Sequence, residues 1–239
     1  MTTIGHLCKK SSVGGMAIDD DARKAARANP TTDLSLADVR DSMRASRDPR
    51  AERTRQAILE AVESLDVQMA DEATVSGIVR AAGISRSSFY THFSGIDELA
   101  LTMLARAFDE IGSGDLALRQ ARGMTGAAAA RAALDRLTQH LDEHRGLYVS
   151  VFGLPATSQA FGQAVTLYAE HAMETFALLT GVPAGLDLPT VATYIAGGTL
   201  TVLSAWLRSD APAPREEVVA LLFAQLPAWL AAPSGIDRA

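Results

Sequence analysis

Apolar residues recur every three or four positions along most of the chain, a spacing that places them on one face of an α-helix. The first such stripe, formed by Ile58, Val62, Leu65 and Met69, follows Pro49, and proline is favoured at the first position of a helix. Alternation with period two, typical of strands, is scarce, so we expect an all-α fold. The same spacing predicts further helices at residues 97–110, 127–144, 158–179, 191–207 and 216–230.

Residues 71–104 carry closely spaced signals for helix starts and stops. Gly83 is expected to end a first short helix, because glycine adopts the left-handed backbone of a helix stop at little cost. Clusters of glycine and proline predict loops at 112–114, 153–155, 181–189 and 210–214. Candidate N-caps of the short helices are Asp71 or Thr74 and then Ser85, and Ser94 with Asp97 has the serine-x-x-acid pattern of a capping box.

The stretch AAGISRSSFYTHF, residues 81–93, joins a glycine turn to a very polar short helix. Phe89 and Phe93 are four residues apart, so both can face the core. Two short helices joined by such a turn describe a helix-turn-helix, whose second helix enters the major groove of DNA. Arg86, Ser87 and Ser88 point outward and are expected to read or flank bases. Tyr90, Thr91 and His92 point outward as well and are expected to hold phosphates.

The segment from Arg53 to Leu104 resembles the DNA-binding domain of TetR-family transcriptional regulators. The matching pieces are Arg-Thr-Arg at 53–55, Thr-Val at 74–75, Ala-Gly-Ile-Ser at 82–85 and Phe-Tyr-Thr-His-Phe at 89–93. The resemblance implies that Arg53, Thr74 and Val75 also contact DNA. Arg53 and Thr74 are expected to bind phosphates. The chain departs from the family at Met69, where glycine is usual, and at Ile96, where a phosphate-binding lysine is usual. The second departure predicts weaker DNA binding or compensation by the arginines of residues 40–55.

The resemblance implies a homodimer with an N-terminal DNA-binding domain and a larger C-terminal helical domain for effector binding and dimerisation. The expected division is a flexible extension at 1–48, a helix-turn-helix domain at 49–95, an effector and dimerisation domain at 96–232 and a tail at 233–239. The expected function is sequence-specific transcriptional regulation of a DNA operator, as a repressor released by a small apolar or amphipathic ligand. The helix at 97–110 would couple ligand to DNA. No catalysis, cofactor or metal is expected.

Aromatic residues of the C-terminal half either line an effector pocket or form plain core. The pocket candidates are Phe108, Tyr148, Phe152, Phe161, Tyr168, Met173 and Phe176. The uncharged helical segments 191–207 and 218–230 are expected to supply the self-complementary apolar surface of a dimer, with Gly197 and Gly198 permitting close backbone approach. The interface candidates are Ile195, Val202, Trp206, Leu222, Leu226 and Trp229.

Charge and cysteine content limit the class of protein and the cellular compartment. The chain has 239 residues and a net charge of −6, so it is not basic as a whole. Six arginines within residues 40–55 form either a phosphate-facing arm or a solvated charge run. The one cysteine, Cys8, excludes a disulfide framework within the chain and fits a reducing cytoplasm. Uncharged stretches near 146–169, 188–207 and 218–236 contain proline and polar residues, so we expect buried helices and no membrane span.

Two other functions compete with DNA binding. The stretch HLDEH, residues 140–144, matches the H-x-x-E-H pattern of some zinc peptidases. His140 and His144 would lie on one helical face as zinc ligands, with Glu143 as a general base. Alternatively, His144 lies at an exposed helix end, where a cation is favoured. A helical scaffold without DNA affinity is the other alternative, and it leaves the exposed Arg86, Tyr90 and His92 unexplained.

Overall fold

The computed structural model describes residues 49–64, 73–120, 125–152, 159–179 and 181–230, and every regular element within these ranges is helical. The expected all-α class is confirmed. The predicted extension at 1–48 and tail at 233–239 lie outside the described residues. The helices are α3 (Pro49–Ser64), α4 (Val75–Ala81), α5 (Arg86–His92), α6 (Ile96–Gln120), α7 (Gly126–Glu143), α8 (Arg145–Phe152), α9 (Gln159–Ala177), α10 (Leu188–Leu207), α11 (Arg215–Gln225) and the short 3₁₀ turn η1 (Ala228–Leu230).

The first helices begin and end where local chemistry predicts. α3 starts at Pro49. The Thr74 hydroxyl accepts a hydrogen bond from the Gly77 amide at 3.1 Å and so caps α4. Gly83 follows with φ of +64°, a left-handed conformation that glycine tolerates. The Ser85 hydroxyl then caps α5 by accepting from the Ser88 amide at 3.1 Å.

α6 is longer than its sequence pattern predicts. It runs unbroken through residues 112–114, so the predicted loop there is wrong and the predicted helix at 97–110 is too short. The glycines permit close packing instead. A Cβ added at Gly112 would lie 2.6 Å from Cε1 of His171 on α9, and one at Gly114 would lie 1.9 Å from an Arg136 guanidinium nitrogen on α7. The exposed Arg136 guanidinium can move away, but the buried His171 ring cannot, so Gly112 is the glycine that lets α9 pack against the backbone of α6.

The acid that caps the start of α6 is Glu98 and not Asp97. Its Oε2 accepts a hydrogen bond from the Ser94 amide at 2.7 Å. α6 begins at Ile96, so Glu98 is its third residue and reaches back to the chain ahead of the helix. The predicted capping box therefore has the right function with the partner displaced by one position.

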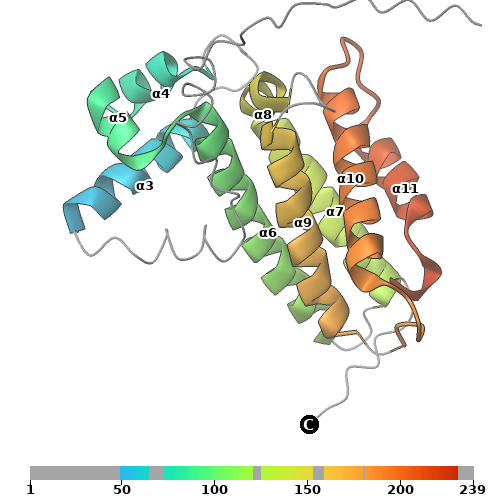
Figure 1. Cartoon of the computed structure of the whole chain (residues 1–239). Coiled ribbons are helices and arrows are strands. Elements are labelled where there is room, and N and C mark those ends of the chain that lie inside the picture. The colour runs from blue at the N-terminus through green and yellow to red at the C-terminus, as the bar shows by residue number, and fades with distance from the viewer. Residues whose placement is uncertain (1–48, 65–72, 121–124, 153–158, 180, 231–239) are drawn as a thin grey trace, which may run out of the picture. The chain divides into compact units, whose positions relative to one another are not determined.

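The longer helices pack as a bundle around one main core. α9 packs against both α6 and α10, and α7 packs against α6 and α11 (Figure 1). The main hydrophobic cluster extends without interruption from Ile58 on α3, through Phe89 and Phe108, to Leu222 on α11. α6 therefore contributes to the cores of both ends of the described chain. A smaller cluster surrounds Phe176 and includes Ile195 and Leu230.

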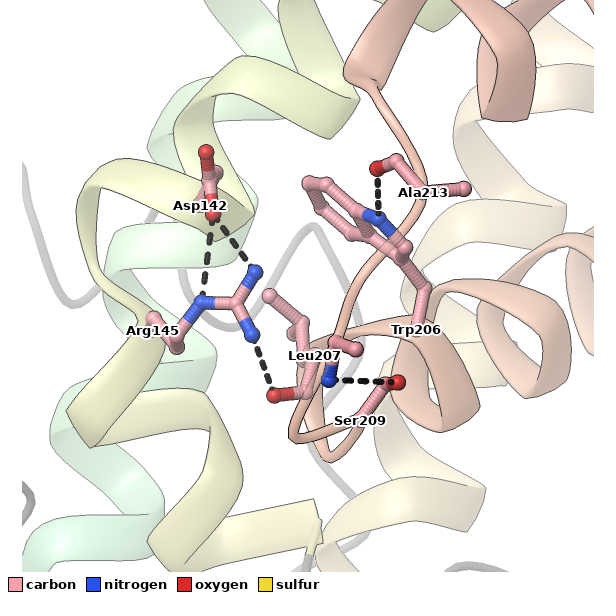
Figure 2. Close-up of polar contacts among 7 residues, drawn as sticks. Asp142, Arg145, Trp206, Leu207, Ser209 and Ala213 are labelled. Atoms are coloured by element: carbon pink, nitrogen blue, oxygen red, sulfur yellow. Dashed lines mark hydrogen bonds and ion pairs between the residues drawn. The ribbon is translucent and has the colours of Figure 1, made fainter.

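An arginine ties the start of α8 to the end of α10 (Figure 2). The Arg145 guanidinium donates to the Leu207 carbonyl at 2.5 Å and to the Asp142 carboxylate at 2.9 and 3.2 Å. It also lies 5.1 Å from the centre of the Trp206 ring, whose indole N–H donates to the Ala213 carbonyl at 2.8 Å. Leu207 is the last residue of α10, so Arg145 satisfies a carbonyl that no N–H within that helix reaches.

The predicted last helix at 216–230 is interrupted. α11 ends at Gln225, and Leu226 is extended with ψ of 143°. Pro227 explains the break, because proline lacks an amide hydrogen and disfavours helical backbone at the residue before it. The chain then makes only the short turn η1.

One helix in the described part of the chain, α10, is long and apolar enough to cross a membrane by length and composition. Half of its apolar window is buried within the protein, where α10 packs on α9. The core position of α10 therefore explains its apolar composition.

Candidate nucleic-acid interface and effector cavity

α5 presents a polar surface on an aromatic anchor. Phe89 and Phe93 are fully buried, with ring centres 5.7 Å apart. Tyr90 is 50% exposed, and its ring packs edge-on against Phe89. Arg86, Ser87 and Thr91 are exposed as well, whereas Ser88 and His92 are half-buried. The six residues predicted to face DNA thus share one short, capped helix.

Hydrogen bonds between neighbouring residues order this polar face. Arg86 donates to the Ser76 hydroxyl of α4 at 3.4 Å, so it links the two helices of the helix-turn-helix. Ser87 shares a hydroxyl contact of 2.8 Å with Ser85, and the Thr91 hydroxyl donates to the Ser87 carbonyl at 3.0 Å. The contact made by Arg86 is long, so exchanging it for a base edge or a phosphate costs little.

The three further DNA-binding candidates lie on α3 and at the start of α4. Arg53 is exposed, and its Nε donates to the Pro49 carbonyl at 3.0 Å. The Thr74 hydroxyl oxygen is occupied as the cap of α4, which leaves its hydrogen to donate. Val75 is half-buried and packs against the main core, so its side chain is a structural contact.

Arg55 does not face solvent as the basic-arm interpretation of residues 40–55 implies. It is buried, its guanidinium lies 4.7 Å from the centre of the Phe93 ring, and it donates to the His92 carbonyl at 3.5 Å. Burial lowers the pKa of Arg55, and the nearby Glu98 and Glu52 partly oppose that shift. Arg55 therefore holds the C-terminal end of α5 against α3. Within the described part of residues 40–55, Arg50 and Arg53 are the exposed arginines.

A cavity of about 80 Å³ lies between α6, α7, α9 and α10, and Leu226 after α11 and Leu230 of η1 also line it. Its wall is mainly apolar, with a carboxyl group, an imidazole and two hydroxyls, of Tyr168 and Thr175, as the polar groups of the described lining. The lining residues are Phe108, Ile111, Asp115, Ala130, Ala133, Leu134, Leu137, Tyr168, His171, Ala172, Thr175, Phe176, Ile195, Leu226 and Leu230.

The structure brings only part of the predicted pocket set to this cavity. Phe108, Tyr168 and Phe176 line it. Three other predicted aromatics pack with one another in the main core: Tyr148, Phe152 and Phe161. Met173 packs against the smaller cluster, outside the cavity lining.

Asp115 and His171 are cavity residues that the sequence interpretation missed. Both are buried, with 5% and 7% of their surface exposed. A signal exists for Asp115, because it continues the spacing of Phe108 and Ile111 along the buried face of α6. His171 likewise follows Tyr168 by three residues on α9. Acids are rarely buried in proteins, so an acid on an apolar helical stripe indicates a candidate ligand contact.

The residues predicted to form a dimer interface lie deeper in the protein than a contact surface requires. Ile195, Trp206 and Leu222 are buried, and Ile195 lines the cavity together with Leu226. Val202 and Trp229 are half-buried. The large apolar side chains that α10 and α11 leave exposed are Tyr194, at 75%, and Leu221, at 55%.

Both histidines of HLDEH, His140 and His144, make hydrogen-bond contacts within the protein. His140 Nε2 lies 2.7 Å from the hydroxyl of the buried Tyr148, and His144 Nδ1 donates to the His140 carbonyl at 2.9 Å. Burial lowers the pKa of His140 to about 3, with a contribution from His144, and it raises the pKa of Tyr148. Glu143 accepts from Gln139 at 2.7 Å. No group of three or more potential metal ligands occurs among the described residues, so the zinc alternative has no support.

Comparison with known proteins decides between the remaining alternatives. The sequence model described as "Bacterial regulatory proteins, tetR family" matches residues 58–103, which include α4, α5 and the start of α6. A TetR-family transcriptional regulator from Streptomyces coelicolor is 25% identical, with a TM-score of 0.51, over 72% of this chain and 78% of that one. The chain therefore carries a TetR-family DNA-binding domain at residues 58–103.

With this domain the chain is a DNA-binding transcriptional regulator, which disfavours a helical scaffold without DNA affinity. Two further structures are also similar. The Thermus thermophilus repressor FadR, solved with lauroyl-CoA, is 16% identical over 71% of this chain and 91% of that one, with a TM-score of 0.48. The repressor QsdR of R. erythropolis is 17% identical over 79% and 97%, with a TM-score of 0.43. No curated protein matches the sequence.

Proposed function

We propose that this TetR-family regulator is a repressor that binds its operator as a homodimer through α5 and leaves it when a small ligand enters the cavity at α6. The observation that carries the proposal is the polar face of α5, held on the buried Phe89 and Phe93 and capped by Ser85. Arg86, Ser87 and Ser88 would read or flank bases. Tyr90, Thr91 and His92, with Arg53 and Thr74, would hold phosphates.

The chemistry of α5 suits this division of roles. A guanidinium can donate two parallel hydrogen bonds to a guanine edge, worth about 1–3 kcal/mol of discrimination against other bases. The Tyr90 hydroxyl is half-exposed at the end of a rigid ring and can donate to a phosphate. Ile96 replaces the usual phosphate-binding lysine, so Arg50 and Arg53 on α3 would supply part of the missing charge.

A dimer is supported by the outer face of α10 and α11. One α5 buries too little surface for tight operator binding, and a dimer reads two half-sites. Along α10, Tyr194, Gly198, Thr201 and Ala205 are exposed and uncharged, and Leu221 is exposed on α11. We propose that these residues meet their counterparts in the partner, in place of the buried Ile195, Trp206 and Leu222.

The coupling between ligand and DNA would run through α6. Phe108 lines the cavity, and the first turns of the same helix pack against the α3–α5 core. A ligand that binds better to a conformation with wrongly spaced recognition helices would release the operator. In this proposal the DNA-binding domain spans residues 49–95, and the effector and dimerisation domain spans residues 96–232. The protein acts in the cytoplasm, by binding and without catalysis.

The test is binding of the full chain to labelled DNA from the region upstream of its own gene, measured across a salt series. The Arg86→Ala, Tyr90→Ala double variant should bind at least about tenfold more weakly. Arg136→Ala removes an exposed arginine on α7, away from α5 and from the proposed dimer face, and serves as the matched control, with binding close to wild type. Sequence-independent binding by the wild-type chain, or no loss in the double variant, would refute operator reading by α5.

A further inference from the structure

A groove between α6 and α7 lies beside the cavity at α6. Its volume is about 310 Å³, against about 80 Å³ for the cavity. Exposed polar side chains line the groove, among them Glu110 and Glu143, whereas the cavity wall is mainly apolar. The same pair of helices therefore carries a polar, water-filled hollow next to an apolar one.

Ile111 lies where the two hollows meet. Among the residues that the structure describes, it is the side chain that lines both. On the same helix Phe108 and Asp115 line the cavity, and Ala107 and Glu110 line the groove. Ile111 is buried, with 6% of its surface exposed. A single aliphatic side chain thus borders an apolar interior on one side and a polar surface groove on the other.

The size of the cavity limits the apolar group that it can take. A cavity of about 150 Å³ takes up one benzene molecule, which corresponds to about 25 Å³ per carbon atom. At that ratio about 80 Å³ accommodates about three carbon atoms. On the α9 side the wall cannot move outward freely, because the buried His171 ring lies directly against the Gly112 backbone. Ile111 is backed by the open groove instead, so it is the part of the wall that can give way.

We infer that the ligand is a small amphiphile with a short unbranched tail, that the tail lies in the cavity and the hydrated head in the α6–α7 groove, and that Ile111 sets the length of the tail. This inference rests on the proposed role of the cavity as the effector site. Burial of the tail raises affinity about fourfold per methylene group. The head keeps its water or exchanges it for hydrogen bonds to exposed groups such as Gln139 and Glu143, so its desolvation costs little.

A series of uncharged 1,2-diols tests the limit on tail length, because the tail grows by one carbon at each step from 1,2-butanediol to 1,2-heptanediol. Binding to the full chain is followed by NMR of the isoleucine δ1 methyl groups, since Ile111 and Ile195 both line the cavity. In the wild-type chain the affinity should rise about fourfold from butanediol to pentanediol. Beyond pentanediol it should rise less than about twofold per carbon, because the tail then fills the cavity.

Truncation of Ile111 should move this limit. Ile111→Val should extend the rise by about one carbon, and Ile111→Ala should let the affinity rise about fourfold per step through heptanediol. Ile195 supplies the signal in both variants, and thermal unfolding shows whether each is folded. The valine variant is conservative enough to carry the test alone. Ile58→Val is the matched control, because it makes the same truncation in α3 at a buried residue outside both hollows, and it should keep the wild-type limit.

Nuclear Overhauser contacts give the direction of the bound diol. The terminal methyl group of the tail should contact the Ile195 methyl group in the cavity. The protons beside the two hydroxyls should contact the Ala107 methyl group in the groove.

Three results would overturn the inference. They are the same dependence on tail length in wild type and in folded Ile111 variants, a diol bound with its tail at Ala107, and no methyl shift at about 50 mM diol, well above the expected millimolar dissociation constant. Operator binding is measured separately on the same samples. Loss of operator recognition with an intact, Ile111-dependent limit would refute the proposed repressor function and leave the ligand class standing.

Discussion

Replacing Arg145 by methionine tests the contact between α8 and α10 shown in Figure 2. Methionine keeps most of the aliphatic stem and removes the guanidinium. The Leu207 carbonyl then loses its donor at a residue that is buried, which costs about 1–3 kcal/mol. Loss of the stacked position over Trp206 adds about 0.5–1 kcal/mol. The ion pair with Asp142 adds little, because the Asp142 side chain is 42% exposed.

We therefore expect Arg145→Met to lower the free energy of unfolding by about 1.5–4 kcal/mol. The assay is equilibrium unfolding in urea, followed by circular dichroism at one fixed protein concentration, because the stability of a dimer depends on concentration. Asp142→Asn is the matched control, since it removes the ion pair alone and should cost less than about 1 kcal/mol. The reasoning is refuted if Arg145→Met unfolds within about 0.5 kcal/mol of wild type, or if Asp142→Asn is equally costly.

Two other predictions concern pH and assembly. The pKa of His140 is lowered to about 3 in the folded chain, so the unfolded chain binds the extra proton between about pH 6.5 and pH 3, and stability should fall as pH drops through that range, by about 2 kcal/mol at pH 5. Urea unfolding of His140→Asn should show a flatter dependence between pH 7 and 5, and an unchanged slope would contradict the assignment. The wild-type chain should sediment as a dimer in analytical ultracentrifugation, and Leu221→Glu should shift it towards monomer. Ala211→Glu places the same charge on an exposed turn outside that face and should remain dimeric, whereas a monomeric wild type or a dimeric Leu221→Glu would exclude this surface.

Local signals predict the DNA-binding end of the chain well. Thr74, Gly83 and Ser85 each act within a few residues, through a hydroxyl on a nearby amide or a left-handed backbone, so a short window of sequence contains the whole cause. The burial of Phe89 and Phe93 follows from their spacing for the same reason. These are the features of the fold that the sequence predicts correctly.

Errors arise where the cause lies on another helix. Gly112 looks like a loop residue until His171 is placed against it, and the two are 59 positions apart in the sequence. α10 is apolar on most of its surface, so its sequence does not show which side faces the core and which faces a partner. The sequence pattern therefore places Ile195 on the dimer surface, whereas the structure places it in the cavity wall.

The continuity of the main core through α6 has a consequence for recombination between regulators. Leu99 and Leu104 belong to the same hydrophobic cluster as Phe89 and Phe93, so the first turns of α6 contribute to the core that also buries the DNA-binding helix. A segment that ends at residue 95 would lack the part of this core that α6 contributes around Phe89 and Phe93. A chimera that joins this DNA-binding domain to the effector domain of another regulator therefore requires a junction inside α6, beyond Leu104. The side chains of this chain should be kept up to that junction.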